Sequence, residues 1–381
     1  MTDKPIRYGM VGGGPGAFIG AIHRMAARLE GRYELLAGAF SSDRERGRAA
    51  GSELGVAPQR TYLGYEEMAQ SEASRPDGIE AVVIVTPNHL HYPVARAFLE
   101  AGVHIICDKP LTTTVSDALA LRDLVKSTGK LFFVAYTYGT YPMVSQAREM
   151  VRGGQLGTVR VVQVEYAQGW LSTALETQGS PQARWRTDPA LAGQGGCLGD
   201  IGTHAYHLVE YVTGLRTQSV AAELTRFVPG RRLDDNVQVM LRFVGGAKGS
   251  LWASQVAAGE DNALRIRIYG DQASVCWDQE HPEELRFAAL GAPAQVLRRG
   301  GAGVGPWATG VTHLPVGHPE GTLEGFGLLY SEVADAIIAV RERRPVPAIR
   351  VATIEEGVAG MQFIDACVRS AQRDAAWVAL A

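Results

Sequence analysis

Short apolar segments alternate with helical patterns over the first 135 residues, and this alternation constrains the fold more than any other feature. The segment 81–86 has almost no polar residue, which is typical of a central strand covered on both faces. Strands that alternate with helices at short spacing predict a parallel sheet with right-handed crossovers. Strands are predicted at 6–11, 33–40, 81–86, 103–107 and 131–135, and helices at 20–29, 94–101 and 118–126.

The pattern changes after Tyr136. In the segment 263–269, Leu264, Ile266 and Ile268 alternate with polar residues, which predicts a strand buried on one face. Strands joined by glycine-rich turns indicate an antiparallel sheet with one open face. We therefore place one domain boundary near 135, giving domains 1–135 and 136–381. In the second domain we expect strands at 237–243 and 249–256, helices at 144–152, 323–344 and 353–373, and a long loop at 293–318.

Bulk composition excludes several classes of protein. The chain has 381 residues and a net charge of -3, which argues against a nucleic-acid or anionic-membrane partner because both need a basic face. The four cysteines are far apart and form no zinc or disulfide pattern, so no metal site is predicted. No apolar run approaches the roughly 20 residues of a membrane span, and no cleavable signal is recognisable. We expect a cytoplasmic protein.

A glycine-rich loop joins the first strand to the first helix. Gly12, Gly14 and Ala17 fit the G-x-G-x-x-G/A pattern of dinucleotide-binding domains. In that pattern the glycines permit a tight turn and a close approach to a pyrophosphate, and the helix N-terminus attracts the phosphates. An ordinary tight turn is the alternative. The predicted cofactor contacts are Gly12, Gly14, Pro15, Gly16, Ala17, Phe18 and Ile19.

The end of the second strand leaves the choice of cofactor open. An aspartate there usually forms hydrogen bonds with the adenosine ribose of NAD, but here Ser41 lies at about that position. Ser41, Ser42 and Arg44 suit the 2′-phosphate of NADP, whereas Asp43 suits the ribose of NAD. We favour NAD, with NADP as the alternative, because no second basic residue lies beside Arg44 before Arg46.

Two further motifs carry groups that alcohol oxidation needs, namely a base for the hydroxyl proton and a cation that stabilises the alkoxide. Lys109 directly follows a buried strand, at the sheet edge where ligands bind in such folds. Asp200 and His204 are four residues apart, so on a helix they share a face and the carboxylate can tune the imidazole. Taken singly, a solvated lysine and a capping aspartate beside a buried histidine are equally ordinary readings.

Taken together and in order, the motifs resemble those of the Gfo/Idh/MocA family, named after glucose–fructose oxidoreductase, inositol dehydrogenase and rhizopine catabolism. The resemblance covers essentially the whole chain. It implies an α/β Rossmann domain followed by an α+β domain with a large, mostly antiparallel open sheet, often buried in a homodimer or homotetramer. The motifs are Gly12 to Ala17, Thr86-Pro87-Asn88, Asp108-Lys109-Pro110 and Asp200-Ile201-Gly202-Thr203-His204.

The resemblance also implies roles for individual residues. Lys109 matches the family's lysine near the nicotinamide, and Asp200 and His204 match its substrate-pocket pair. We expect His204 to act as general base and Lys109 to stabilise the alkoxide. Asp108 replaces the commoner glutamate of the family. The cofactor cleft is expected to be lined by Thr86, Pro87, Asn88, His91 and Asp108.

Two departures from the family pattern bear on the substrate. Tyr136-Thr137-Tyr138 stands where the family often has asparagine, and Gln194 interrupts a run of glycines after Trp185-Arg186. We expect a small polyhydroxylated substrate, because tryptophan and tyrosine are plausible sugar platforms. The candidate substrate contacts are Tyr138, Trp170, Trp185, Arg186 and His318.

The predicted function is an NAD(P)-dependent dehydrogenase that oxidises a secondary hydroxyl of a sugar, anhydrosugar or inositol. Two alternatives are an NAD-dependent glycosidase that oxidises its substrate transiently, and a regulator that binds the cofactor without turnover. The presence of Lys109, Asp200 and His204 together argues against the regulator.

Overall fold

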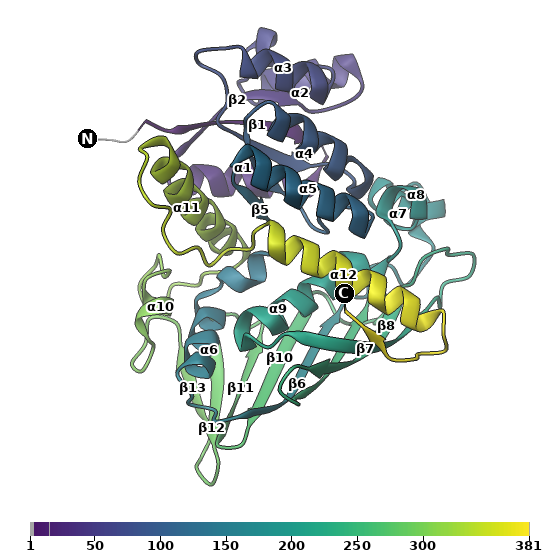
Figure 1. Ribbon diagram of the computed structural model, residues 1–381, viewed down its shortest axis with the longest axis vertical. Helices are drawn as coiled ribbons and strands as arrows, with labels where there is room; N and C mark the ends of the chain where they lie inside the picture. Colours follow the sequence, from purple (N-terminus) through teal and green to yellow (C-terminus); the bar gives the residue numbers. More distant parts are fainter. Residues whose placement is uncertain (1–3, 15, 381) are drawn as a thin grey trace. The chain divides into compact units, whose positions relative to one another are not determined.

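The alternating segments of the first 135 residues form a five-stranded sheet of order β2-β1-β3-β4-β5, in which every pair of neighbours is parallel (Figure 1). All residues of β3 and β4 are buried, as the apolar sequence of 81–86 predicted. The parallel sheet is therefore confirmed. Its strands are β1 (Ile6–Gly12), β2 (Tyr33–Ala39), β3 (Ala81–Val85), β4 (His104–Cys107) and β5 (Phe132–Val134).

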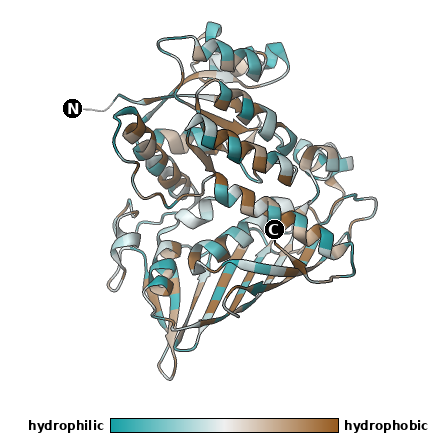
Figure 2. Ribbon diagram, in the orientation of Figure 1, coloured by the Kyte–Doolittle hydropathy of each residue, from teal (hydrophilic) through white to brown (hydrophobic). Residues whose placement is uncertain are grey.

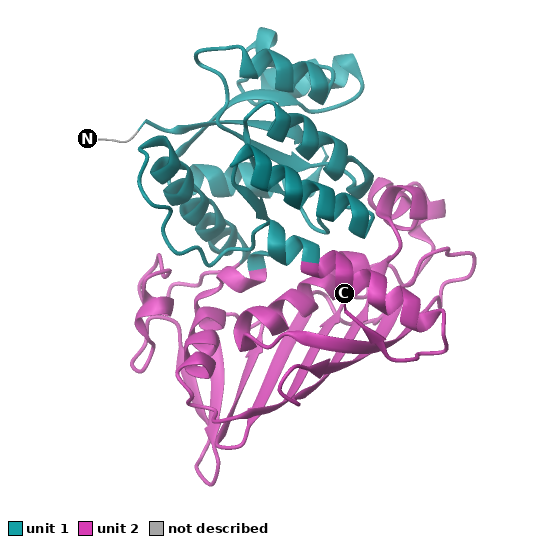
Figure 3. Ribbon diagram, viewed as in Figure 1, with its two compact units in different colours: residues 1–137, 322–358 teal, residues 138–321, 359–381 magenta. Residues whose placement is uncertain are grey.

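The computed structural model describes residues 4–14 and 16–380, and it forms two units (Figure 3). Unit 1 consists of residues 1–137 and 322–358, and unit 2 of residues 138–321 and 359–381. The segment 322–358 thus belongs to unit 1, although the sequence analysis places it in the second domain. The reason is that α11 packs against α1 and β1. In addition, the hydroxyl of Tyr33, the first residue of β2, donates a hydrogen bond to the carbonyl of Tyr330 on α11 (2.8 Å).

Five helices of unit 1 begin within about three residues of the predicted positions, whereas the helices at Arg44–Glu53 and Tyr65–Ala73 were not predicted. Thr114 caps α5, because its hydroxyl accepts a hydrogen bond from the Asp117 amide (3.1 Å). The amide of Thr353 donates to the Glu356 carboxylate (2.8 Å) at the start of α12, which confirms the predicted capping box. The helices are α1 (Phe18–Leu29), α2 (Arg44–Glu53), α3 (Tyr65–Ala73), α4 (His91–Glu100), α5 (Val115–Thr128), α11 (Thr322–Arg341) and α12 (Ile354–Ala371), which ends in unit 2, with 3-10 turns at Pro58–Arg60 and Asn88–Leu90.

Unit 2 is built on a nine-stranded sheet of order β13-β12-β11-β10-β6-β9-β8-β7-β14. Only the β6–β9 pair is parallel, so the sheet is mostly antiparallel, as the family resemblance implied. The strands are β6 (Val159–Ala167), β7 (Thr217–Thr225), β8 (Asn236–Phe243), β9 (Lys248–Ser254), β10 (Ala263–Gly270), β11 (Ala273–Asp278), β12 (Glu284–Ala289), β13 (Gln295–Arg298) and β14 (Val378–Ala379).

One face of this sheet is covered and the other is open. Helices α6 (Pro142–Arg152) and α9 (Thr203–Thr213) pack on it, and hydrophobic and hydrophilic residues alternate along its strands (Figure 2). On the other face Val161, Met240 and Tyr269 are exposed. The shorter helical elements are α7 (Pro181–Arg186), α8 (Pro189–Ala192), a π-helical turn at Leu198–Gly202 and 3-10 turns at Thr137–Thr140 and Leu175–Thr177.

The prediction of a loop without secondary structure over 293–318 is wrong in part. The four residues of β13 pair with β12, and Pro306–Thr309 forms the single turn α10. Both elements are too short to show a periodic pattern. No helix in the described part of the chain is long and apolar enough to cross a membrane.

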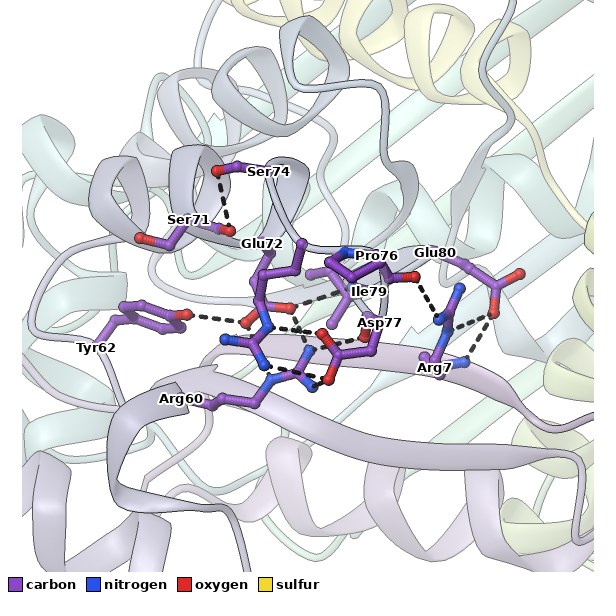
Figure 4. A network of polar contacts seen from close by, with 11 residues as sticks. Arg7, Arg60, Tyr62, Ser71, Glu72, Ser74, Pro76, Asp77, Ile79 and Glu80 are labelled. Atoms are coloured by element: carbon purple, nitrogen blue, oxygen red, sulfur yellow. Dashed lines mark hydrogen bonds and ion pairs between the residues drawn. The ribbon is translucent and has the colours of Figure 1, made fainter.

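A buried ion pair organises the chain before β3 (Figure 4). The Glu72 carboxylate on α3 accepts hydrogen bonds from the Arg60 guanidinium, the Tyr62 hydroxyl (2.8 Å) and the Ile79 amide (3.2 Å). Glu72 is 1% exposed, so these donors replace the water that a buried carboxylate lacks. The network thereby holds the chain where it enters the central strand.

His104 makes the stability of the protein dependent on pH. Burial, with the charge of Lys130, lowers the pKa of this imidazole from 6.5 to about 4, and its Nδ1 accepts a hydrogen bond from the Leu131 amide (3.0 Å). Because the folded pKa lies below the unfolded one, the unfolded state binds the proton first. The stability that neutral His104 provides is therefore lost as the pH falls below 6.5.

Because of His104, we expect the free energy of unfolding of the wild-type protein to fall by about 2 kcal/mol between roughly pH 7 and pH 5. His104→Asn keeps an acceptor for the Leu131 amide but cannot be protonated, so it should lack this contribution. Urea unfolding of both proteins at the two pH values measures the difference, and other titrating groups cancel in the comparison. Equal losses in the two proteins would contradict the assignment.

Candidate active site

The glycine loop lies between the carboxyl ends of β2 and β3. A Cβ atom on Gly12 would come within 2.7 Å of the Val85 carbonyl oxygen, and one on Gly14 would come within 2.7 Å of that of Phe40. Gly12 also has a φ of +84°, which disfavours other residues. Both positions therefore require glycine. Gly16 has open space where its Cβ would lie, but its φ of +82° likewise disfavours other residues; Pro15 falls outside the described residues.

The start of α1 is suited to an anion. Ala17 precedes the helix in an extended conformation without a side-chain cap, and the first turn has no acidic residue. Such an N-terminus presents amide N–H groups and the positive end of the helix dipole. Beside Gly12, the buried hydroxyl of Thr86 has no hydrogen-bond partner among the described residues. The glycine cradle and this hydroxyl fit a dinucleotide phosphate.

The residues after β2 lie as a turn into α2. The Ser41 hydroxyl accepts a hydrogen bond from the Asp43 amide (3.1 Å), and the Asp43 carboxylate caps α2 by accepting from the Arg46 amide (2.8 Å). Ser42, Asp43 and Arg44 are exposed. The Asp43 carboxylate is thus engaged by its own helix, which leaves Ser41 as the residue at the usual place of the ribose-binding acid.

His91 links the ends of β3 and β4. Its Nε2 lies 3.0 Å from the Thr86 carbonyl oxygen and its Nδ1 lies 2.8 Å from that of Pro110. Burial lowers the pKa of His91, so the ring is neutral and donates to one of the two oxygens. Lys109 follows β4, and its peptide bond to Pro110 is cis. Asn88, in the turn after β3, is 6% exposed.

In unit 2, Asp200 and His204 are carried by a π-helical turn that continues into α9. The expectation of a regular helix through this pair is therefore wrong: Asp200 lies in the π turn and His204 in the α-helix. The buried Asp234 carboxylate fixes the turn by accepting from the amides of Gly196 and Leu198 (both 2.7 Å). Burial raises the pKa of Asp234 to about 6, which the two amide hydrogen bonds oppose.

Two side chains hold the Asp200 carboxylate. Its Oδ2 accepts hydrogen bonds from Arg186 Nε (3.2 Å) and Gln255 Nε2 (2.8 Å). The Arg186 guanidinium lies 4.2 Å from the centre of the Trp185 ring and 6.0 Å from that of Trp170. The structure thus brings four of the predicted residues together, and it adds Gln255, which the sequence analysis missed.

Tyrosine rings surround His204. The centres of the Tyr138 and Tyr166 rings lie 4.9 and 6.3 Å from that of His204, both edge-on. The two tyrosine hydroxyls are 2.5 Å apart, and that of Tyr166 donates to Asn262 Oδ1 (2.7 Å). Burial raises the pKa of Tyr138 to about 12, so its phenol stays protonated. Tyr138 was predicted, whereas Tyr166 and Asn262 were not.

The predicted substrate residue His318 is held by other contacts. Its carbonyl accepts a hydrogen bond from the Arg299 guanidinium, and its side chain is exposed. Arg299 is buried and also contacts Glu283 and Glu320. These contacts fix the loop without involving Asp200 or His204. Over residues 4–14 and 16–380, no group of three or more His, Cys, Asp and Glu side chains could hold a metal ion.

Comparison with known proteins decides the family. Residues 6–136 match the oxidoreductase family with an NAD-binding Rossmann fold, and residues 144–276 match the GFO/IDH/MocA C-terminal domain. The chain belongs to the Gfo/Idh/MocA family. This confirms the resemblance noted in the sequence. The protein is an oxidoreductase with the family's NAD-binding domain, so the prediction of NAD is confirmed.

Individual Gfo/Idh/MocA proteins resemble the chain over most of its length. The uncharacterized oxidoreductase YfiI of Bacillus subtilis is 37% identical, covering 99% of this chain and 98% of its own. A levoglucosan dehydrogenase of Pseudarthrobacter phenanthrenivorans is 32% identical, covering 86% of each chain. An inositol dehydrogenase homolog from Azotobacter vinelandii, crystallised with NAD+, has a TM-score of 0.96 and 40% identity, covering 99% of this chain and 98% of its own.

Proposed function

We propose that this Gfo/Idh/MocA protein is an NAD-dependent dehydrogenase that oxidises a secondary hydroxyl of an inositol, sugar or anhydrosugar. The observation that carries the proposal is the cluster around Asp200 and His204, which combines a carboxylate, an imidazole, phenols and a guanidinium beside indole rings. A polyol presents many hydroxyls, each both donor and acceptor, on a compact apolar frame. The names of the levoglucosan and inositol relatives support the same substrate class.

Residues 1–135 would hold the cofactor and residues 136–381 the substrate. We propose that the phosphates lie on the loop Gly12–Ala17 and the start of α1, with Thr86 and His91 in the same cleft. Bound NAD supplies the electron-pair acceptor of the reaction. The exposed Val161, Met240 and Tyr269 support the expectation of a homodimer or homotetramer, because exposed apolar groups on a sheet favour self-association. A cytoplasmic location remains part of the proposal.

Three side chains would contact the substrate hydroxyls during oxidation. His204 accepts the proton of the hydroxyl that is oxidised, and Lys109 donates a hydrogen bond to the same oxygen and stabilises its negative charge. Asp200 accepts a hydrogen bond from a neighbouring hydroxyl. Hydrogen bonds from Arg186 and Gln255 to its Oδ2 hold this carboxylate in place. The fixed carboxylate orients the polyol and thereby chooses the carbon that reacts.

A substrate screen tests this function. The full-length protein is incubated with NAD or NADP and with a panel of inositols, monosaccharides and levoglucosan, while NADH and sugar products are followed. We expect net NADH formation with at least one free polyol. Cleavage of an aryl glycoside without net NADH would favour the glycosidase instead. NAD binding without turnover of any substrate in the panel would favour the regulator.

Ser41 provides a test of cofactor selectivity. Replacing Ser41 with Asp is expected to lower kcat/KM for NADP by at least about tenfold relative to that for NAD, because a carboxylate repels a 2′-phosphate and binds a ribose. Steady-state kinetics with both cofactors measure the ratio. Ser52→Asp adds the same charge at an exposed position of α2 and should leave the ratio unchanged. An unchanged ratio in Ser41→Asp would place the adenosine ribose elsewhere.

A further inference from the structure

Asp108, the residue before Lys109, is contacted by a histidine from a different helix. His23 lies on α1, the helix that follows the glycine loop, and is 0% exposed. Its Nε2 is 3.4 Å from the Asp108 carboxylate, and its Nδ1 is 2.8 Å from the Tyr330 hydroxyl on α11. Segments 85 and 307 residues away from His23 therefore meet at one imidazole.

The chemistry of the three groups sets the direction of both hydrogen bonds. A carboxylate only accepts, so Nε2 of His23 carries the proton that faces Asp108. Burial holds the pKa of Tyr330 well above its usual value, so its hydroxyl is protonated and can donate to Nδ1. In a neutral imidazole that carries its proton on Nε2, Nδ1 is an acceptor, so we infer that Tyr330 donates to His23, which in turn donates to Asp108.

The Asp108 carboxyl is ionised in this setting. Burial by itself raises its pKa, but the hydrogen bond from His23 and the positive charge of Lys109 lower it below the usual value. The Tyr330 ring packs edge-on against His23 and against Tyr33. The ring centres are 5.8 Å apart in the first pair and 5.1 Å apart in the second. The carboxylate therefore receives a donor whose position is fixed by a buried cluster.

We propose that His23 and Tyr330 are positioning residues that hold the Asp108 carboxylate, and through it the backbone of Lys109, in the arrangement that oxidation requires. The proposal rests on the proposed role of Lys109. Helix α1 would then contribute to the site in two ways: its N-terminus binds the cofactor phosphates, and its residue His23 contacts Asp108. Neither His23 nor Tyr330 contacts the substrate in this proposal.

The short side chain of Asp108 is part of the same arrangement. Glutamate at this position is one methylene longer, so its carboxylate would be driven toward His23, which is only 3.4 Å away. Removing the imidazole would make room for the longer side chain. The effects of Asp108→Glu and His23→Ala on kcat are therefore expected to be non-additive, as those of contacting residues are in a double-mutant cycle.

The tautomer of His23 is the first test, and it does not depend on activity. In protein labelled with 15N-histidine, we expect the neutral Nε2–H signature for His23 without added substrate or NAD. Tyr330→Phe removes the donor to Nδ1 and should alter this signature. Tyr33→Phe is the matched control, since the Tyr33 hydroxyl bonds only the Tyr330 backbone in this cluster and its loss should leave the tautomer unchanged. An Nδ1–H tautomer in wild type would overturn the proposal.

Kinetics are the second test. Tyr330→Phe should lower kcat about fivefold, the effect of one hydrogen bond on a barrier, with KM for NAD and the unfolding temperature close to those of Tyr33→Phe. Asp108→Glu should lose about tenfold in kcat, and adding His23→Ala to it should cost less than His23→Ala costs in the wild-type background, because both variants disturb the same contact. Additive losses in the double variant would overturn the proposal. If Lys109→Met retained full activity while the wild-type tautomer was as expected, the role of Lys109 would fail instead.

Discussion

Replacing His204 with Asn is expected to slow polyol oxidation by roughly 100-fold or more, because the hydroxyl loses the base that takes its proton. Asparagine retains polar groups of similar size but cannot bind a proton at neutral pH. The edge-on rings of Tyr138 and Tyr166 should still pack around the shorter side chain. The measurement is kcat at saturating NAD and substrate, with NADH affinity measured by fluorescence and expected to stay near the wild-type value.

His207→Asn is the control for this experiment. His207 lies one turn further along α9, is 7% exposed and stacks beside Tyr211 (ring centres 5.7 Å apart). A loss of packing in α9 would affect both variants, whereas loss of the base affects only His204→Asn. A His204→Asn enzyme with a rate within about threefold of wild type would remove His204 from the mechanism.

The second large effect is expected for Lys109→Met. Removing a cation that stabilises the alkoxide should lower kcat by about 10²–10³, the range found when one donor to a developing oxyanion is deleted. Methionine preserves much of the apolar length of lysine, so the fold beside Pro110 should persist. Steady-state kinetics with the best substrate of the screen provide the comparison.

Lys126→Met controls for the loss of one positive charge on unit 1. Lys126 is exposed on α5, and its replacement should leave kcat unchanged. Lys109→Arg keeps the charge but not the compact ammonium, so we expect a rate between those of wild type and Lys109→Met. A Lys109→Met enzyme as fast as Lys126→Met would show that the alkoxide is stabilised by another group.

The features that the sequence predicted well are local. The glycine loop follows from spacing, and the caps at Thr114 and Thr353 follow from residues three positions apart. Strand β10 was recognised because one face is buried, which imposes a period of two on its residues. Each of these signals lies within one element, so no knowledge of distant contacts was needed.

The features that were missed depend on contacts between distant segments. Gln255 follows β9 and Asn262 precedes β10, yet they reach Asp200 and Tyr166 only because the sheet aligns these strands. The π-helical turn at Asp200 leaves no periodic signal. The placement of α11 in unit 1 depends on Tyr330, whose partners Tyr33 and His23 are almost 300 residues or more away. A single sequence carries no pattern that identifies such partners.

The fate of the carbinol hydrogen tests the central claim most directly. A polyol that supports NADH formation is prepared with deuterium on the carbon that is oxidised, and the NADH is analysed by mass spectrometry. The account predicts one deuterium in each NADH molecule and one oxidised sugar per NADH, with His204→Asn slower but the label in the same place. Unlabelled NADH, or sugar product formed without net NADH, would contradict it.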